Sequence, residues 1–377
     1  MTTAAMAPPD LSAPLSGRIA TVTGALVVPP PKGSGNRTVQ RSGVLGPDGR
    51  YVAQSMTWRG ERPITLPPAP PPEGEIETLP GRWLFLGPLF GHFGHFLVES
   101  LARIWAFDAL RHDLDGVLYV PKAQVRPQHV ARSFRPLLGA LGLDAPMRNL
   151  EAPTRVERLH VPPQGLGMFD MIEGAPEFRR FIRRHAGADI PADGPERIYI
   201  SRSALPAARG SILGESWLER RLAQEGYVAF HPQQHDHRTQ IATYKAARRI
   251  VSVDGSPLHL LAMVGDAGQR VGIVARRPGG LDEVFARQIR AFSGASVTLC
   301  GPPRGNWVPD GAAGPNRLSW GEIDFPRAGA ALAEGGLVDH GPSWTGPEPA
   351  ELAAEIARVG AANGRAFHRF DAERPGR

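Results

Sequence analysis

Cysteine is almost absent from this chain, since Cys300 is the only one among 377 residues. A single thiol excludes an internal disulfide and any metal centre built from several thiolates. No apolar run approaches the roughly 18–20 residues that a membrane-spanning helix needs. Residues 1–17 contain no basic segment followed by an apolar core, the pattern that a secretory signal requires. We therefore expect a cytoplasmic protein. These observations do not exclude peripheral contact with an inner-membrane assembly.

Lysine is also scarce: Lys32, Lys122 and Lys245 are the only ones, so arginine supplies nearly all of the basic charge. The net charge of +6 and the pI of about 9.9 raise the question of nucleic acid. The basic residues are scattered among acidic ones, however, and form no basic tail. Because zinc-finger spacing, a basic region with heptads and an aromatic-basic RNA-binding pattern are all missing, we expect no nucleic acid among the partners.

The composition is that of a folded protein, with 42% apolar and 21% charged residues, and the length suits one large or two ordinary domains. The N-terminal part predicts a loose tail (1–16), β-type segments (19–28 and 51–58) and a proline-dense connector (66–74). We divide the chain into four parts: a tail with a β-rich elaboration (1–75), an N-terminal α/β domain (76–190), a C-terminal α/β domain (191–305) and a Gly/Pro-rich segment with a final helix at 350–362 (306–377).

Strands and helices alternate in both central parts. In the first, the apolar periodicity predicts strands at 82–86, 117–120 and 156–161 and helices at 95–110, 129–141 and 176–185. In the second, it predicts strands at 197–201, 227–231, 250–253, 271–274 and 296–300 and helices at 215–224 and 238–247. Such alternation favours parallel strands joined by crossover helices, with a linker at 187–194 between two nucleotide-binding-like sheets.

One stretch, residues 250–264, combines a strand, a tight turn and a helix. Asp254 and Gly255 form the turn, Ser256 is suited to cap the helix, and Pro257 to occupy its first position. The free amide groups at such a helix start, together with the positive end of the helix dipole, favour the binding of an anion.

Three segments of the chain, in the same order, resemble family-61 glycosyltransferases. The run Phe90-Gly91-His92-Phe93-Gly94-His95-Phe96-Leu97-Val98-Glu99-Ser100-Leu101-Ala102-Arg103 resembles the family signature Asn-Tyr-x-His-Trp/Phe-Leu-x-Glu-x-Leu-x-Arg. The run Arg197-Ile198-Tyr199-Ile200-Ser201-Arg202 resembles its Tyr-Ile-Ser-Arg segment, and residues 250–261 fall where it carries a Gly-x-His-Gly-Ala-x-Leu-Thr-Asn loop. The chain departs from the pattern at several positions: His92 replaces Asn, Asp254 the loop His, Ser256-Pro257 Ala-Gly, and His259 Thr.

This resemblance, which extends to the bacterial capsular polysaccharide group, implies a fold and a reaction. The fold is α/β and GT-B-like, with two Rossmann-like domains facing a central cleft and, in this chain, the N-terminal β-rich elaboration. The reaction is inverting transfer of a sugar from a nucleotide-sugar to a glycan or lipid-linked glycan acceptor in surface polysaccharide biosynthesis. The resemblance implies no cofactor and no essential metal.

Inverting transfer needs a base for the acceptor hydroxyl and positive charge for the departing diphosphate. His95 and Glu99 lie four residues apart on one helix face after a strand, so we predict that His95 is the base and that Glu99 orients it or binds acceptor hydroxyls. A structural role for this pair is the alternative. His92 is a weaker candidate on the acceptor side.

For the donor, Arg202 follows the strand at 197–201 and can clamp diphosphate oxygens. Ser201 and the amides of Gly255 and Ser256 would assist it, and Arg209 is a second arginine on the same loop. Arg202 therefore has two possible roles, this diphosphate contact or an ordinary surface ion pair.

Other polar residues leave two interpretations open. Asp254 either accepts from sugar or ribose hydroxyls or braces its turn, and His259 either faces the donor or packs inside its helix. The cluster His231, His235, Asp236 and His237 lacks a settled ligand spacing, and a solvated loop is favoured over a metal site.

Two other classes of function compete with sugar transfer. A non-catalytic nucleotide- or sugar-binding protein with a degenerate fold agrees with the replaced His and Asn positions, but His95, Glu99 and Arg202 argue for an enzyme. A serine hydrolase acting through Ser256 is disfavoured because Gly-x-Ser-x-Gly is absent.

Overall fold

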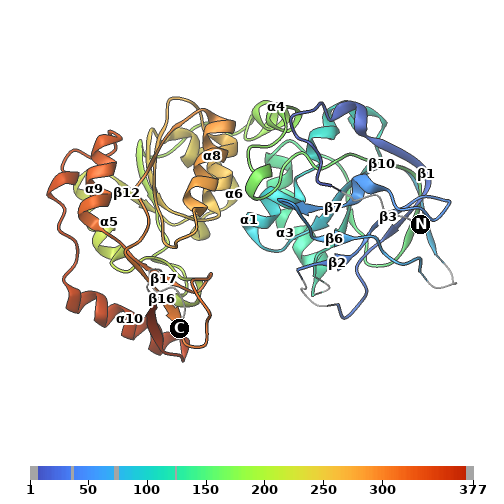
Figure 1. Ribbon diagram of the computed structural model, residues 1–377. Helices are drawn as coiled ribbons and strands as arrows, with labels where there is room; N and C mark the ends of the chain where they lie inside the picture. Colours follow the sequence, from blue (N-terminus) through green and yellow to red (C-terminus); the bar gives the residue numbers. More distant parts are fainter. Residues whose placement is uncertain (1–6, 35–37, 72–75, 124, 371–377) are drawn as a thin grey trace. The chain divides into compact units, whose positions relative to one another are not determined.

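The computed structural model describes residues 7–34, 38–71, 76–123 and 125–370. The chain forms two compact units, Met1–Asp189 and Ile190–Arg377, which we call the N-terminal and the C-terminal unit (Figure 1). The division lies within the segment 187–194 that the sequence suggested as a linker.

The N-terminal unit is built on a six-stranded sheet in the order β3-β1-β10-β7-β8-β9. Strands β10, β7, β8 and β9 run parallel, as the alternation of strands and helices predicts, while β1 pairs antiparallel with both β10 and β3. The bounds are β1 (Ala20–Val28), β3 (Gly43–Leu45), β7 (Glu77–Leu89), β8 (Gly116–Pro121), β9 (Met147–Asn149) and β10 (Thr154–Val161). The predicted β-rich elaboration therefore contributes strands to the same sheet.

The sheet buries Val27, Phe85, Leu118 and Val156 in one cluster, because successive side chains of a strand point to opposite faces. Two long helices belong to this unit, α3 (Pro127–Ala140) and α4 (Pro176–His185), close to their predicted bounds. The remaining small elements are β2 (Gln40–Arg41) with β6 (Thr65–Leu66), β4 (Trp58–Arg59) with β5 (Arg62–Pro63), and the 3-10 turns η1 (Ser16–Arg18), η2 (Ala53–Ser55) and η6 (Phe169–Met171).

Two predictions for the N-terminal region were wrong. Residues 51–58 do not form one strand, because the turn η2 interrupts them and only β4 at their end is a strand. The described part of the expected loose tail is anchored at Leu15, which is fully buried and whose amide donates to Glu177 Oε1 at 3.0 Å. Residues 1–6 of the tail and 72–74 of the connector lie outside the described residues.

The helix predicted over residues 95–110 is also wrong, because the segment is broken into short pieces. A turn of α-helix, α1 (Phe93–His95), runs into a π-helix, η3 (Phe96–Ser100). A bend at Leu101 and a turn at Ala102 and Arg103 then precede η4 (Ile104–Ala106), α2 (Phe107–Leu110) and η5 (Arg111–Asp113). The apolar spacing is that of a helix, but the Ser100 and Arg103 side chains bond to distant backbone and hold the irregular path. Single π-turns inside helices often mark functional sites.

The C-terminal unit contains an entirely parallel five-stranded sheet in the order β12-β11-β13-β14-β15. Its strands agree with the predicted ones: β11 (Arg197–Ile200), β12 (Val228–Phe230), β13 (Arg249–Val253), β14 (Arg270–Val274) and β15 (Ser296–Leu299). Because β12 lies outside β11 and β13 lies on its other side, the connections reverse direction between β11 and β13. This is the doubly wound order in which ligands bind at the strand ends beside the reversal.

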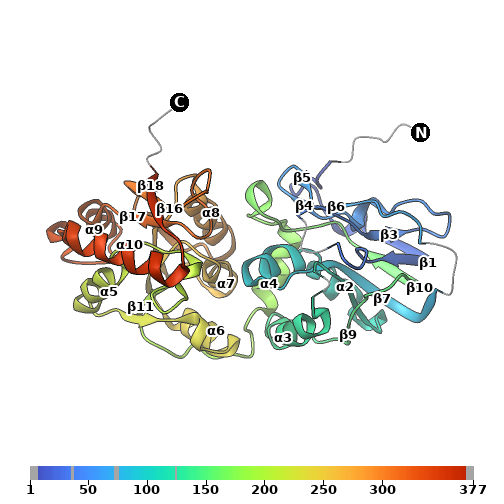
Figure 2. The same cartoon turned by 90° about the horizontal axis from the view of Figure 1, so that it is seen from below.

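Helices cover both faces of this sheet (Figures 1 and 2). On one face, α5 (Glu215–Gln224) and α9 (Phe325–Glu334) bury apolar side chains against Tyr199, Val251 and Val253. On the other lie α6 (His237–Ala246), α7 (Pro257–Val264) and α8 (Leu281–Ser293). The chain thus folds as an α/β protein, as the sequence predicts.

The last third of this unit is more regular than its Gly/Pro content suggested. Beyond residue 300 the chain adds α9, an antiparallel sheet in the order β17-β16-β18, the 3-10 turn η9 and the final helix α10 (Pro349–Asn363), which was predicted. The sheet comprises β16 (Gly305–Pro309), β17 (Trp320–Glu322) and β18 (Phe367–Phe370). Within the part of the chain that the structure describes, none of the helices has the length and apolar character needed to cross a bilayer.

Candidate functional site

A pocket of about 460 Å³ opens in the N-terminal unit where β7 and β8 end. Its polar wall is formed by Arg59, His92, His95, Lys122 and Asn149. Apolar side chains complete it: Leu89, Phe90, Pro121, Val125, Pro127 and Val130. A concave, mainly apolar site with a few convergent polar groups is the usual form of a small-molecule site.

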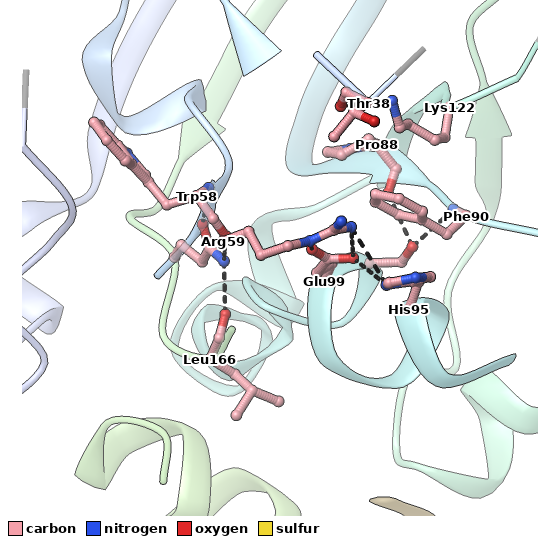
Figure 3. Close-up of polar contacts among 11 residues, drawn as sticks. Thr38, Trp58, Arg59, Pro88, Phe90, His95, Glu99, Lys122 and Leu166 are labelled. Atoms are coloured by element: carbon pink, nitrogen blue, oxygen red, sulfur yellow. Dashed lines mark hydrogen bonds and ion pairs between the residues drawn. The ribbon is translucent and has the colours of Figure 1, made fainter. Parts of the chain in front are cut away.

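His95, which lines this pocket, contacts Glu99 behind it, so the pair singled out from the sequence is in contact (Figure 3). His95 Nδ1 lies 2.8 Å from Glu99 Oε2, and the Glu99 side chain is fully buried whereas that of His95 is 35% exposed. Arg59 completes the group, because its Nε lies 2.8 Å from Glu99 Oε1 and its Nη2 lies 3.0 Å from Oε2. The carboxylate therefore accepts three hydrogen bonds, two of them from one guanidinium.

These contacts settle which nitrogen of His95 carries the proton. Burial acts to raise the pKa of Glu99, but the hydrogen bonds and charges of His95 and Arg59 outweigh it and lower that pKa, so the carboxyl is ionised. An ionised carboxylate has no hydrogen to donate, so Nδ1 is the donor in the 2.8 Å contact. Arg59 Nη2 lies 3.4 Å from the same Nδ1, but two donors cannot form a hydrogen bond with each other. Nε2 remains as the nitrogen that can accept a proton.

Arg59 was missed by the sequence analysis because its position depends on distant parts of the chain. Gln164 bonds to both backbone groups of Trp58, accepting from the amide at 2.7 Å and donating to the carbonyl at 3.0 Å. Arg103, fully buried, donates to the carbonyl oxygens of Met56 and Gln54. A local sequence motif cannot predict contacts between residues so far apart in the chain.

Arg103 also ties this segment to the main sheet. Its Nε donates to Pro162 O at 3.0 Å, after β10, and its Nη1 reaches Leu86 O at 3.4 Å in β7. Gly87 permits this close approach at a bulge in β7, where φ is +99° and a Cβ would lie 2.6 Å from Arg103 Nη1. The final arginine of the signature run is thus a structural residue that positions Arg59.

His92, the weaker acceptor-side candidate, also lines the pocket. It is exposed at the start of α1, and its ring centroid lies 5.1 Å from that of His95. The structure therefore brings His92, His95 and Glu99 together, as the predicted grouping requires.

A second polar site lies in the C-terminal unit, at the carboxyl ends of three adjacent strands. Arg202 follows β11, the turn Asp254-Gly255 follows β13, and Arg276 and Arg277 follow β14. Because β13 lies between β11 and β14 in the sheet, these residues meet at one edge, beside the point where the strand connections reverse.

Arg202 is held with its guanidinium next to the turn. Its backbone amide donates to Glu215 Oε1 at 2.6 Å, and Nη2 donates to Gly210 O at 2.9 Å. Nη1 faces Gly255, since a Cβ there would lie 3.1 Å away from it. Burial and, after it, the charge of Arg276 lower the pKa of Arg202 to about 10.

Arg276 and Arg277 were missed by the sequence analysis, although a pair of arginines directly after a predicted strand was a usable signal. Arg276 is 7% exposed, and its Nη1 is buried without a hydrogen-bond partner among the described residues. Arg277 Nε is also buried and has no hydrogen-bond partner among the described residues. Buried charged donors are normally satisfied, so unpaired ones at a strand edge indicate room for an anion.

Asp254 braces its turn, one of the two interpretations left open. Its Oδ1 accepts from Arg276 Nε at 2.6 Å, and its amide donates to Val274 O at 3.0 Å. Its Oδ2 is buried and has no partner among the described residues. Asp254 therefore aligns Arg276 and retains one oxygen for a ligand hydroxyl.

Two predicted donor contacts, those of Ser201 and His259, are placed elsewhere. Ser201 is 2% exposed and its hydroxyl lies 2.6 Å from Glu219 Oε1. His259 is buried against α8, with Nδ1 2.5 Å from Gln288 Oε1, which agrees with the packed alternative. Ser256 precedes α7 but its side chain makes no capping hydrogen bond, so that part of the prediction was wrong. Arg209 is exposed on η7 (Ala207–Arg209), and its carbonyl accepts from Arg202.

The histidine-rich loop before α6 has a structural explanation. Asp236 caps α6 by accepting from the Thr239 amide at 2.7 Å, and the His235 ring stacks on Phe230 with centroids 4.7 Å apart. Across the described part of the chain, no group of three or more His, Cys, Asp or Glu side chains is arranged to hold a metal ion.

Comparison with known proteins adds a family to this geometry. Residues 93–270 match the family model described as Glycosyltransferase 61, a span that includes His95, Glu99, Arg202 and Asp254. No curated protein matches the chain at a significant level. The match agrees with the resemblance found in the signature segments, and it implies a sugar donor and an acceptor as substrates. The chain thus contains a glycosyltransferase family 61 domain and is a glycosyltransferase.

Proposed function

We propose that this enzyme transfers a sugar, with inversion, from a nucleotide-sugar to a glycan or lipid-linked glycan acceptor in surface polysaccharide biosynthesis. The observation that carries the proposal is the His95–Glu99 contact, which leaves His95 Nε2 as a proton acceptor on a pocket wall. Nε2 would take the proton of the acceptor hydroxyl as its oxygen attacks the anomeric carbon of the donor. The bond from that carbon to the nucleoside diphosphate breaks in the same step.

The arginine site of the C-terminal unit is suited to the leaving group. Arg202, Arg276 and Arg277 would hold the diphosphate, and the amides at the start of α7 would contribute further donors. Burial and, after it, the charge of Arg276 lower the pKa of Arg277, and a bound diphosphate would offset the repulsion between these like charges. Asp254 Oδ2 would accept from a ribose or sugar hydroxyl.

We assign the acceptor to the N-terminal unit and the donor to the C-terminal unit, the division of labour of a GT-B-like enzyme. The arginines would supply the positive charge that a metal ion supplies in other transferases, so we expect transfer without an essential metal. We place the enzyme in the cytoplasm, where nucleotide-sugars are made, with peripheral contact with an inner-membrane assembly.

The first test is a thermal-shift panel of nucleoside diphosphates and nucleotide-sugars, with and without divalent metal, because a ligand of the native state raises the melting temperature. The donor found in this way is then used to compare the wild type with His95→Gln. We expect at least a 100-fold loss of turnover in the variant with an unchanged thermal shift. Unchanged turnover would show that His95 is not the base.

A further inference from the structure

The acceptor pocket has a positively charged wall. Arg59 and Lys122 supply its charge, His92 and His95 line it beside them, and the described lining residues include no carboxylate. Glu99 lies behind the wall, fully buried, where both of its oxygens are bonded to Arg59 and His95. A ligand in the pocket can therefore contact Arg59 and Lys122 directly, whereas the carboxylate of Glu99 is covered by Arg59 and His95.

Lys122 is the most unusual of these groups because it is nearly buried, at 5% exposure. It follows β8, and its Nζ donates to Gln40 Oε1 at 3.0 Å and to Thr38 O at 3.2 Å. Burial, and then the charge of Arg59, lower the pKa of Lys122 to about 8, while the charge of Glu99 acts in the opposite direction. Burying a lysine here costs free energy, since lysine is among the residues least often buried.

Arg59 presents a donor on the same wall. Its Nε and Nη2 are bonded to Glu99, while its Nη1 makes no hydrogen bond with any described residue. The Phe90 ring lies between Lys122 and His95, with Lys122 Nζ 5.8 Å and the His95 ring centroid 5.4 Å from its own centroid (Figure 3). The ring gives an apolar surface on which the C–H face of a sugar can pack.

Asn149, at the end of β9, adds an acceptor to this wall. It is 6% exposed, and its Nδ2 donates to Pro127 O at 3.1 Å. Its Oδ1 is buried and has no partner within the described ranges. A buried amide oxygen without a donor is suited to a ligand hydroxyl.

We propose that this pocket binds a sugar bearing a negatively charged oxygen group, a carboxylate or a phosphate, so that the acceptor is an acidic glycan. The anionic group lies between Arg59 and Lys122, a sugar hydroxyl donates to Asn149, and the ring packs against Phe90. The inference rests on the proposed function, since it assigns the pocket beside His95 to the acceptor.

The experiment measures binding to the full-length protein by titration calorimetry. The probes are methyl β-D-glucuronide, which carries a carboxylate, α-D-glucose 1-phosphate, which carries a phosphate, and the neutral methyl β-D-glucoside. We expect at least one anionic probe to bind tenfold or more tightly than the neutral one, and the stronger of the two identifies the group. Lys122→Gln should abolish this preference, and Lys122→Arg should retain it. Lys32→Gln, at an exposed lysine that does not line the pocket, should leave it unchanged.

Three results would overturn the inference. The first is equal binding of the three probes, and the second is a preference that persists in Lys122→Gln. The third is displacement of the anionic probe by a nucleoside diphosphate, which would assign the site to the donor. Because the titrations contain no nucleotide-sugar and need no turnover, their failure is distinguishable from a failure of the His95→Gln test of the transfer reaction.

Discussion

Replacing Glu99 by glutamine tests the central geometry of the N-terminal unit. The change keeps the shape of the side chain but replaces one acceptor oxygen by an amide group that donates. Arg59 can still bond to the remaining oxygen, so the amide group is turned toward His95. His95 Nδ1 must then accept instead of donate, which moves the ring proton to Nε2. The nitrogen that would take the proton of the acceptor is thereby blocked.

The magnitude follows from the contacts that change. A wrong histidine tautomer removes general-base catalysis, which contributes about 10²–10⁴-fold, so we expect kcat to fall by that factor. Of the three hydrogen bonds to the carboxylate, one or two are lost, each contributing about 1.5–3 kcal/mol when a charged group takes part. Arg59 is 24% exposed and can turn toward water, so we expect a loss of about 2–4 kcal/mol in the free energy of unfolding.

The pH dependence of this loss gives a further check. The folded protein lowers the pKa of Glu99 from its ordinary value of 4.5. The stabilisation by the ionised form is therefore present above pH 4.5 and is lost as the pH falls through the folded pKa. The difference in stability between the wild type and Glu99→Gln should shrink when urea denaturation is repeated from pH 7 down to pH 4 and below.

Asp108→Asn is the matched control. Asp108 pairs with His185 Nε2 at 2.8 Å in the same unit, but neither residue lines the pocket. This variant should lose stability without a comparable loss of kcat. Turnover of folded Glu99→Gln within threefold of the wild type would refute the assignment of His95 and Glu99 as base and orienting carboxylate.

Two further predictions concern the support of the pocket and the donor site. Gly87→Ala places a Cβ at positive φ and 2.6 Å from Arg103 Nη1, so urea denaturation should show a loss of about 2–4 kcal/mol in the free energy of unfolding. Gly139→Ala is the control, because a Cβ at this position in α3 has open space around it, and it should be neutral or slightly stabilising. Equal stability of the two alanine variants would contradict the close approach. Arg277→Gln should weaken nucleoside diphosphate binding in calorimetry by about tenfold, or about 1.4 kcal/mol, while Arg290→Gln, in an exposed ion pair on α8, should not. Unchanged affinity in the first variant would move the diphosphate away from Arg277.

The sequence by itself determined the elements whose signals are local. The five strands of the C-terminal sheet, the helices α5 and α6 and the turn at Asp254-Gly255 follow from apolar runs, glycines and proline positions. The spacing of His95 and Glu99 was equally informative, because a separation of four residues keeps two side chains on one helix face even where the helix is a π-helix.

The tertiary structure alone decided which distant residues complete each site. Arg59 reaches Glu99 across 40 residues because Gln164 and Arg103 fix the chain around Trp58, and the break of the helix after Ser100 depends on the same contacts. Arg276 meets Asp254 because the order of the parallel strands puts β14 beside β13. Apolar periodicity predicts which face of an element is buried. The pairing between elements is set by packing and by the hydrogen bonds of buried charged groups, and neither of these is a local property of the sequence.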